Sequence, residues 1–251
     1  MSAVTKTPLP KLSGPWMRSR PTLLIVFTVI TVILTVIGLL MALFYAGQDI
    51  TQGEVQRIFY LHVSAFAGAS MALGVSVIAS VLYLWKRDPK WDRLSIPCVE
   101  VGFALALMNL ITGMVWARPI WNTWWTWDPR LTSSAIMILT YAAYFMLRAG
   151  IENPETRRRL TSVYAILAYI TVIVTFVIIR IRPDTIHPAV IGPSPQNAEG
   201  GFELSSSMLA AMSFNMVVWS VFIPWVLIWW RLRIEVLSEY VNVLRAKVAE
   251  Q

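Results

Sequence analysis

The chain has 251 residues, of which 57% are hydrophobic and 14% charged, and its formal net charge is +7. A composition this apolar excludes an ordinary soluble domain and indicates an integral membrane protein. The positive charge is the one expected of loops that face an anionic inner leaflet of membrane lipid, so nucleic-acid binding is not expected.

Apolar segments recur along the chain, each long enough to cross a bilayer core, which takes about 20 helical residues. No strand pattern is strong enough to suggest a barrel. We therefore predict an all-α fold, an integral membrane bundle of six transmembrane helices. The segments lie near residues 22–46, 58–85, 94–116, 131–148, 160–181 and 205–230.

A basic, proline-containing leader, residues 1–21, precedes the first segment. That segment is longer than the apolar core of a secretory signal, about 7–15 residues, so we interpret it as a permanent anchor. Lys and Arg near helix ends remain preferentially in the cytoplasm. A cytoplasmic N-terminus places all but five of the 21 basic residues inside. The count predicts that both termini are cytoplasmic, and the five outside are Arg57, Arg118, Arg130, Arg180 and Arg182.

The third segment carries the conspicuous polar groups of the membrane region. We expect Glu100 to reach the cytoplasmic surface or the helix N-terminus, and Asn109 to bridge two helices; both are left outside the predicted site. Cys98 is the only cysteine, so the chain can form no internal disulfide, thiolate metal site or C-x-x-C-H haem attachment.

The stretch "WNTWWTWDPRLTSS", residues 121–134, follows this segment in an outer loop. Five of the twelve tryptophans fall within twelve residues, whereas an interfacial belt needs only one or two per helix end. Each indole contact is worth about 0.5–1.5 kcal/mol beyond the area it buries, so several together favour a wide flat ligand such as a porphyrin. The five are Trp116, Trp121, Trp124, Trp125 and Trp127.

Asp128 and Pro129 are typical of the N-cap and first position of a helix, the fourth span. Arg130 in its first turn is a candidate partner for an anionic propionate. Arg118, Arg180 and Arg182 are equally well placed, and the sequence does not rank the four.

Only two histidines exist, and the predicted topology puts both on the side of the tryptophans. His62 lies about a turn inside the outer end of the second segment, and His187 lies in the outer loop 182–204. A single histidine is more often a hydrogen-bonded structural residue. Two neutral imidazoles, however, can hold one haem iron from opposite faces, and their pairing beside the tryptophans favours such a site.

The segment "WNTWWTWDPRLTS" resembles the tryptophan-rich WWD signature of the haem-handling proteins of cytochrome c biogenesis. Six spans, the short length and one outer histidine on each side of the signature are most similar to the CcmC family of the system I pathway. The resemblance covers about residues 20–230. Larger relatives, the CcmF and CcsA types, carry a further histidine pair. Asn122 replaces the usual glycine, Ser64 stands where a proline is expected after His62, and Pro188 stands where a polar residue is expected after His187.

The resemblance implies a non-covalent haem b at the periplasmic face of the inner (cytoplasmic) membrane. His62 and His187 would be its axial ligands, beside a site formed by Trp121, Trp124, Trp125, Trp127, Asp128 and Arg130. The haem would pass to the haem chaperone CcmE, with a CcmA-type ATPase, a CcmB-type permease and a small CcmD-type subunit as partners. The chain has no phosphate-binding glycine loop, so we expect no enzyme activity of its own and assign ATP hydrolysis to a partner.

The predicted organisation is a leader at 1–21, a haem-handling membrane domain at 22–230 and a cytoplasmic tail helix at 231–251. The tail has apolar residues at three- and four-residue spacing, which predicts an amphipathic helix that docks on a partner or lies on the membrane. Two alternative functions stay open: a cytochrome b-type electron-transfer subunit, with its histidines at membrane depth, and a haem transporter or permease, with a polar route across the bilayer.

Overall fold

The computed structural model describes residues 21–182, 184–187 and 204–249. Within these ranges the chain is helical and forms no strand, and six helices are long and apolar enough to cross a membrane. The prediction of an all-α bundle with six potential spans is therefore confirmed. The leader falls outside the described residues except for Pro21, as do Pro188 and most of the predicted outer loop.

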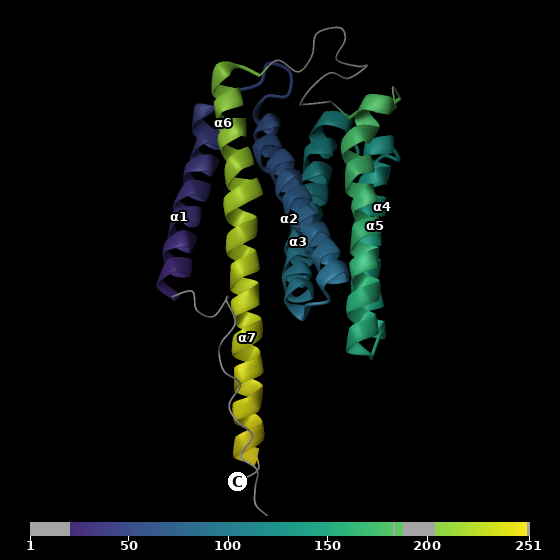
Figure 1. The fold of residues 1–251 in the computed structure, drawn as a ribbon. Helices are drawn as coiled ribbons and strands as arrows, with labels where there is room; N and C mark the ends of the chain where they lie inside the picture. The colour runs from purple at the N-terminus through teal and green to yellow at the C-terminus, as the bar shows by residue number, and fades with distance from the viewer. Residues whose placement is uncertain (1–20, 183, 188–203, 250–251) are drawn as a thin grey trace, which may run out of the picture.

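Helices α2 to α5 follow one another with short connections (Figure 1). Helix α1 ends in a π turn, η1, and a short 3-10 turn, η2, leads into α2. A second π turn, η4, joins α6 and α7 into one rod. The bounds are α1 Pro21–Leu40, η1 Met41–Tyr45, η2 Glu54–Arg57, α2 Ile58–Lys86, α3 Pro89–Trp121, α4 Pro129–Gly150, α5 Pro154–Ile181, α6 Ser206–Val217, η4 Val218–Phe222 and α7 Ile223–Ala249.

Three helices begin with the same local chemistry. An Asp or Asn side chain accepts a hydrogen bond from a backbone N–H of the first turn, and proline occupies the first helical position. The proline lacks an N–H that would otherwise be unsatisfied there, so the pair starts each helix sharply. The capping residues are Asp88 for α3, Asp128 for α4 and Asn153 for α5.

Helix α3 is longer at both ends than the predicted span 94–116. It continues through Pro119 and ends at Trp121, so the placing of Trp116 and Trp121 in a loop is wrong. Asn122 ends the helix in the left-handed conformation, with φ of 55°, and Arg118 donates to its carbonyl oxygen at 2.7 Å. Asparagine tolerates this conformation better than other non-glycine residues, which is why it can replace the usual glycine.

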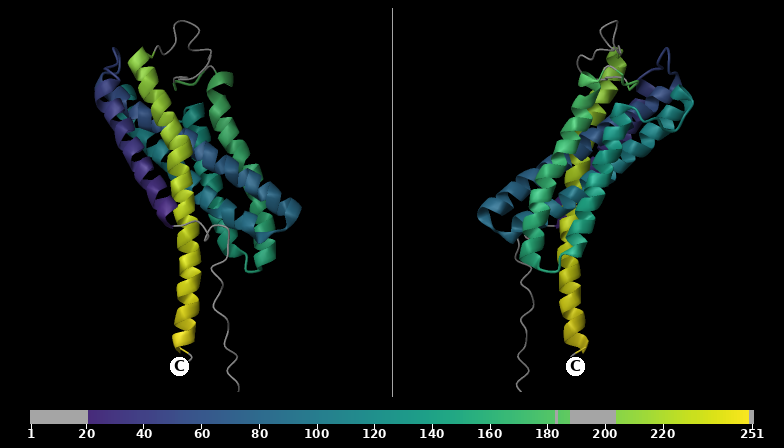
Figure 2. Two further views of the ribbon diagram at one scale, coloured as in Figure 1. Left: turned by 60° about the vertical axis from the view of Figure 1, so that its left-hand side comes forward. Right: turned by 90° about the vertical axis from the view of Figure 1, so that its right-hand side faces the viewer.

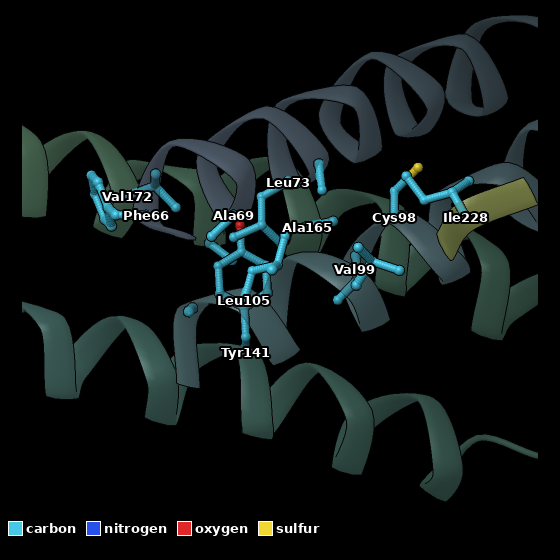
Figure 3. Packing of buried hydrophobic residues seen from close by; sticks show 14 of the residues in the cluster. Phe66, Ala69, Leu73, Cys98, Val99, Leu105, Tyr141, Ala165, Val172 and Ile228 are labelled. Carbon is cyan, nitrogen blue, oxygen red and sulfur yellow. The ribbon is translucent and has the colours of Figure 1, made fainter. Parts of the chain in front are cut away.

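The α2–α3 pair forms the centre of the bundle. The α4–α5 hairpin lies on one side of it, and α1 with the α6–α7 rod lies on the other (Figures 1 and 2). Small residues allow close contact: a Cβ on Gly102 would lie 2.6 Å from Cγ of Leu73. The buried cluster in Figure 3 joins Leu73 of α2 and Leu105 of α3 to Tyr141 of α4. Close approach through small residues is the usual basis of helix association in lipid.

Ion pairs gather at the end of the bundle opposite the histidines. Arg148 donates to both carboxylate oxygens of buried Asp92, at 3.0 and 2.8 Å, and to Thr161 at 2.9 Å. We expected Glu100 to reach the surface or the helix N-terminus. Instead, its carboxylate lies 2.6 Å from the guanidinium of Arg231 on α7. The tail helix therefore continues the last span through Arg231 and is fastened to α3 there.

Candidate functional site

His62 lies in the second turn of α2 and faces α3. Its Nδ1 atom lies 2.9 Å from the carbonyl oxygen of Asn109, and the Asn109 amide donates to the carbonyl oxygen of His62 at 2.8 Å. The backbone carbonyl of Asn109 accepts from Nδ1 in the tautomer that leaves the lone pair on Nε2, and the side-chain amide nitrogen of Asn109 lies 3.4 Å from that Nε2. A hydrogen bond of this kind is the usual orienting contact behind a metal-binding imidazole.

Asn109 was left outside the predicted site, and that placement is wrong. It bridges two helices, as expected, but the group it reaches is the histidine itself. Gly113, one turn later on the same face of α3, completes the contact: a Cβ there would lie 2.8 Å from Cε1 of His62. Asn109, Thr112 and Gly113 share one face of α3, but their spacing alone does not identify His62 as the group they contact.

His187 lies in the segment that follows α5, and Asp128 fixes that segment to the start of α4. One carboxylate oxygen of Asp128 accepts from the N–H of Arg130 at 2.8 Å as the helix cap and from the Thr185 hydroxyl at 3.0 Å. The other accepts from the N–H of Ile186 at 2.8 Å. The carboxylate is buried, so these bonds are shielded from water. Asp128 thus acts as a cap and as a tether for His187.

The two imidazoles come together at this end of the bundle. Their ring centroids lie 6.3 Å apart with an interplanar angle of 34°. Trp116 and Trp121 pack edge to face against each other at 4.9 Å, and each lies beside His187, at 6.4 and 6.3 Å. A cavity of about 40 Å³ lies here. This histidine cavity is lined by His62, Asn109, Leu110, Gly113, Met114, Trp116, Trp121, Trp125, Arg130, Leu131, Ser134 and His187.

The predicted tryptophans divide into two groups. Trp121 and Trp125 line the histidine cavity, together with Trp116. Trp124 and Trp127 do not; their side chains are 54% and 79% exposed. Trp127 packs only its edge against Trp125, with centroids 5.7 Å apart. The connection between α3 and α4 therefore presents an inner and an outer aromatic surface.

The structure distinguishes the four candidate arginines. Arg130 lines the cavity, its guanidinium lies 4.7 Å from the Phe66 ring centroid, and its buried Nη1 has no hydrogen-bond partner among the described residues. Arg118 is bound to the C-cap of α3. Arg182 donates to Asp184 at 2.7 and 2.6 Å, which lowers the pKa of that carboxyl. The guanidinium of Arg180 lies over Phe176. An uncompensated buried donor beside the histidines is suited to an anion.

The donor set at this end suits one iron between two imidazoles. With metal–nitrogen bonds of about 2.0 Å, two axial imidazoles on opposite faces of one iron have ring centroids about 6 Å apart. Among the described residues no group of three or more His, Cys, Asp or Glu side chains could hold a metal ion.

The chain matches the model of a known family over most of its length. The model of the family described as "CcmC: Heme exporter protein C" matches residues 13–247. The chain belongs to the heme exporter protein C family.

Three proteins named "Heme exporter protein C" are similar to this chain. The one from Paracoccus denitrificans is 37% identical over 136 residues, 53% of the chain. The one from Rhodobacter capsulatus is 35% identical over 140 residues, 55% of the chain, and the one from Bradyrhizobium diazoefficiens is 32% identical over 182 residues, 71% of the chain. The matches span 55%, 57% and 66% of these relatives' own lengths. Membership of this family, together with the six potential spans, indicates a multi-pass membrane protein.

Proposed function

We propose that this chain binds a non-covalent haem b between His62 and His187 and presents it to the haem chaperone CcmE for cytochrome c maturation. Nε2 of His62 and one ring nitrogen of His187 are the two axial ligands. The observation that carries the proposal is the 6.3 Å separation of the rings, which suits two imidazoles on one iron. In this proposal haem is the cargo, and its iron provides the coordination chemistry. The chain binds the haem and orients it.

Each neighbouring residue has a role in this proposal. The Asn109 carbonyl holds the Nδ1 proton and so keeps the Nε2 lone pair available. The Arg130 guanidinium pairs with a propionate. Trp116, Trp121 and Trp125 provide rigid faces for the macrocycle. Asp128 keeps His187 in place. The exposed Trp124 and Trp127 contact the outer edge of the bound group and the acceptor protein.

The proposal extends to the setting of the chain. The site faces the periplasm from the inner (cytoplasmic) membrane, with both termini and the tail helix 231–251 in the cytoplasm, as the basic residues predict. A CcmA-type ATPase, a CcmB-type permease and a CcmD-type subunit are the partners that family membership suggests. We assign ATP hydrolysis to the partner ATPase and no catalytic step to this chain.

The histidines provide the decisive experiment. His62→Ala and His187→Ala should each abolish the low-spin bis-histidine absorption spectrum of the purified protein in detergent, because each change removes one axial bond. His187→Gly should recover a low-spin spectrum on addition of imidazole, which separates loss of a ligand from loss of the fold. A wild-type spectrum in both alanine variants would exclude the ligand assignment.

A further inference from the structure

The histidine cavity is much smaller than the group it is proposed to hold. Its volume is about 40 Å³, whereas sites for ligands of several tens of atoms are about 300–1,000 Å³. A porphyrin belongs to the larger class. Part of the cavity wall must therefore move when a macrocycle enters, and the structure indicates which part.

A larger apolar space lies directly behind one wall. It is a groove of about 620 Å³ between α2, α5 and the α6–η4 rod. In Figure 1, α2 runs between α6 and α5. Small residues on α2, Ala67, Ser70 and Gly74, leave room for it. The facing wall includes Ile173, whose side chain is 52% exposed. The helices that border this groove are among the potential spans, so it opens toward lipid.

Phe66 separates the groove from the histidine cavity. It lies four residues after His62, on the same face of α2, and it lines the groove. Its ring packs against the guanidinium of Arg130, which lines the histidine cavity. The Phe66–Arg130 contact thus joins one lining side chain of the groove to one lining side chain of the histidine cavity.

The groove is polarised along its length. At the end near the histidines, two phenylalanine rings of its lining each contact an arginine. The guanidinium carbon lies 4.7 Å from the ring centroid in both cases, Arg130 over Phe66 and Arg180 over Phe176. Toward the other end its lining is apolar, with Val75 and Ile78. A flat apolar ring with an anionic edge matches this distribution, the ring lying in the groove and the carboxylates near the guanidiniums.

We propose that haem enters the site sideways from the bilayer, through the apolar groove, and that Phe66 is the movable wall that admits it. This inference rests on the proposed function and adds the route of the cargo. Displacement of the Phe66 ring joins the two spaces and gives the macrocycle room beside His62. Arg130, released from the ring, is then free to pair with a propionate.

The test measures loading rate separately from final binding. The full chain in proteoliposomes is mixed with vesicles that carry haem, and the low-spin spectrum is followed in time. Ala67→Trp fills the groove from α2 and Ile173→Trp fills it from α5; each should slow loading at least tenfold while the final spectrum stays that of the wild type. Phe66→Ala should load several-fold faster. Leu139→Trp on α4, at an exposed apolar position outside the groove, is the matched control and should load at the wild-type rate.

Two results would overturn the route. If both groove-filling variants load haem at the wild-type rate, haem does not pass through the groove. If the same variants also retain less lipid, the groove holds only acyl chains. Equal slowing in Leu139→Trp would mean that added bulk, and not the groove, sets the rate. Failure of the proposed function looks different, because the wild-type protein would then show no bis-histidine spectrum even at equilibrium.

Discussion

The two ends of the bundle use polar side chains in different ways. At the end remote from the histidines, buried Asp92 meets Arg148, and Glu100 meets Arg231 on α7. At the histidine end, a buried guanidinium N–H of Arg130 has no partner among the described residues, and the imidazoles of His62 and His187 lie beside it. Opposite charges that satisfy one another fasten helices, whereas groups held in place without full partners are ready for a ligand.

The largest effect on stability is expected from disrupting the ion pairs at the end remote from the histidines, here called the fastening end. Asp92→Ala removes the partner of Arg148, whose side chain is only 17% exposed. Loss of one member of such a pair costs about 3–5 kcal/mol, because the other charge stays buried without compensation. We expect a large drop in melting temperature in detergent and an unchanged haem spectrum in the fraction that stays folded. A specific loss of haem affinity in that fraction would contradict the division between the ends.

A smaller and more specific effect is expected at Asn109. Asn109→Leu removes the amide that holds the backbone of His62 against α3 and should weaken haem binding about tenfold or more, as for other groups that orient a ligand. The measurement is a haem titration followed by absorption.

The chain offers a matched control for this change. The amide of Asn215 on α6 likewise donates to two backbone carbonyls, of Gly38 and Ala211. Asn215→Leu should destabilise the fold to a similar degree and leave haem affinity unchanged. An equal loss of haem affinity in both variants would mean that Asn109 contributes only to helix packing.

The smallest effect is expected from an exposed ion pair at the fastening end. Glu239 lies 3.3 Å from Arg93, with both side chains largely accessible. Exposed pairs contribute about 0.2–1 kcal/mol, so Glu239→Gln should change the denaturation midpoint only slightly and the haem spectrum not at all. A large change in either would show that the surface pairs at this end do more than fasten.

The sequence predicted the fold class well because the bilayer imposes a length on each apolar run. It predicted the ends of α3 poorly. Arg118 and Pro119 read as loop residues, yet the side chain of one caps the helix that contains both. Hydropathy cannot register such a cap, so Trp116 and Trp121 were placed in a loop.

The sequence singled out residues of the candidate site but not how they are arranged. The structure brings together His62, His187 and Arg130, which the sequence had singled out. Trp125 points inward and Trp127 points outward because of the path of the short connection between α3 and α4. That path has no helical or strand periodicity, so the sequence pattern does not predict it. Asn109 was missed because its partner depends on the register between α2 and α3, which becomes known only when both helices are placed.

The α6–α7 rod spans 41 residues without a break, from Ser206 to Ala246. At 1.5 Å per residue this is about 60 Å, twice the thickness of a hydrocarbon core. At its start the Ser207 hydroxyl donates to the Ala46 carbonyl oxygen at 3.1 Å, and its far end projects beyond the other helices (Figure 2). A displacement of the projecting end would therefore be carried along one continuous helix to the end of the bundle at which the imidazoles lie.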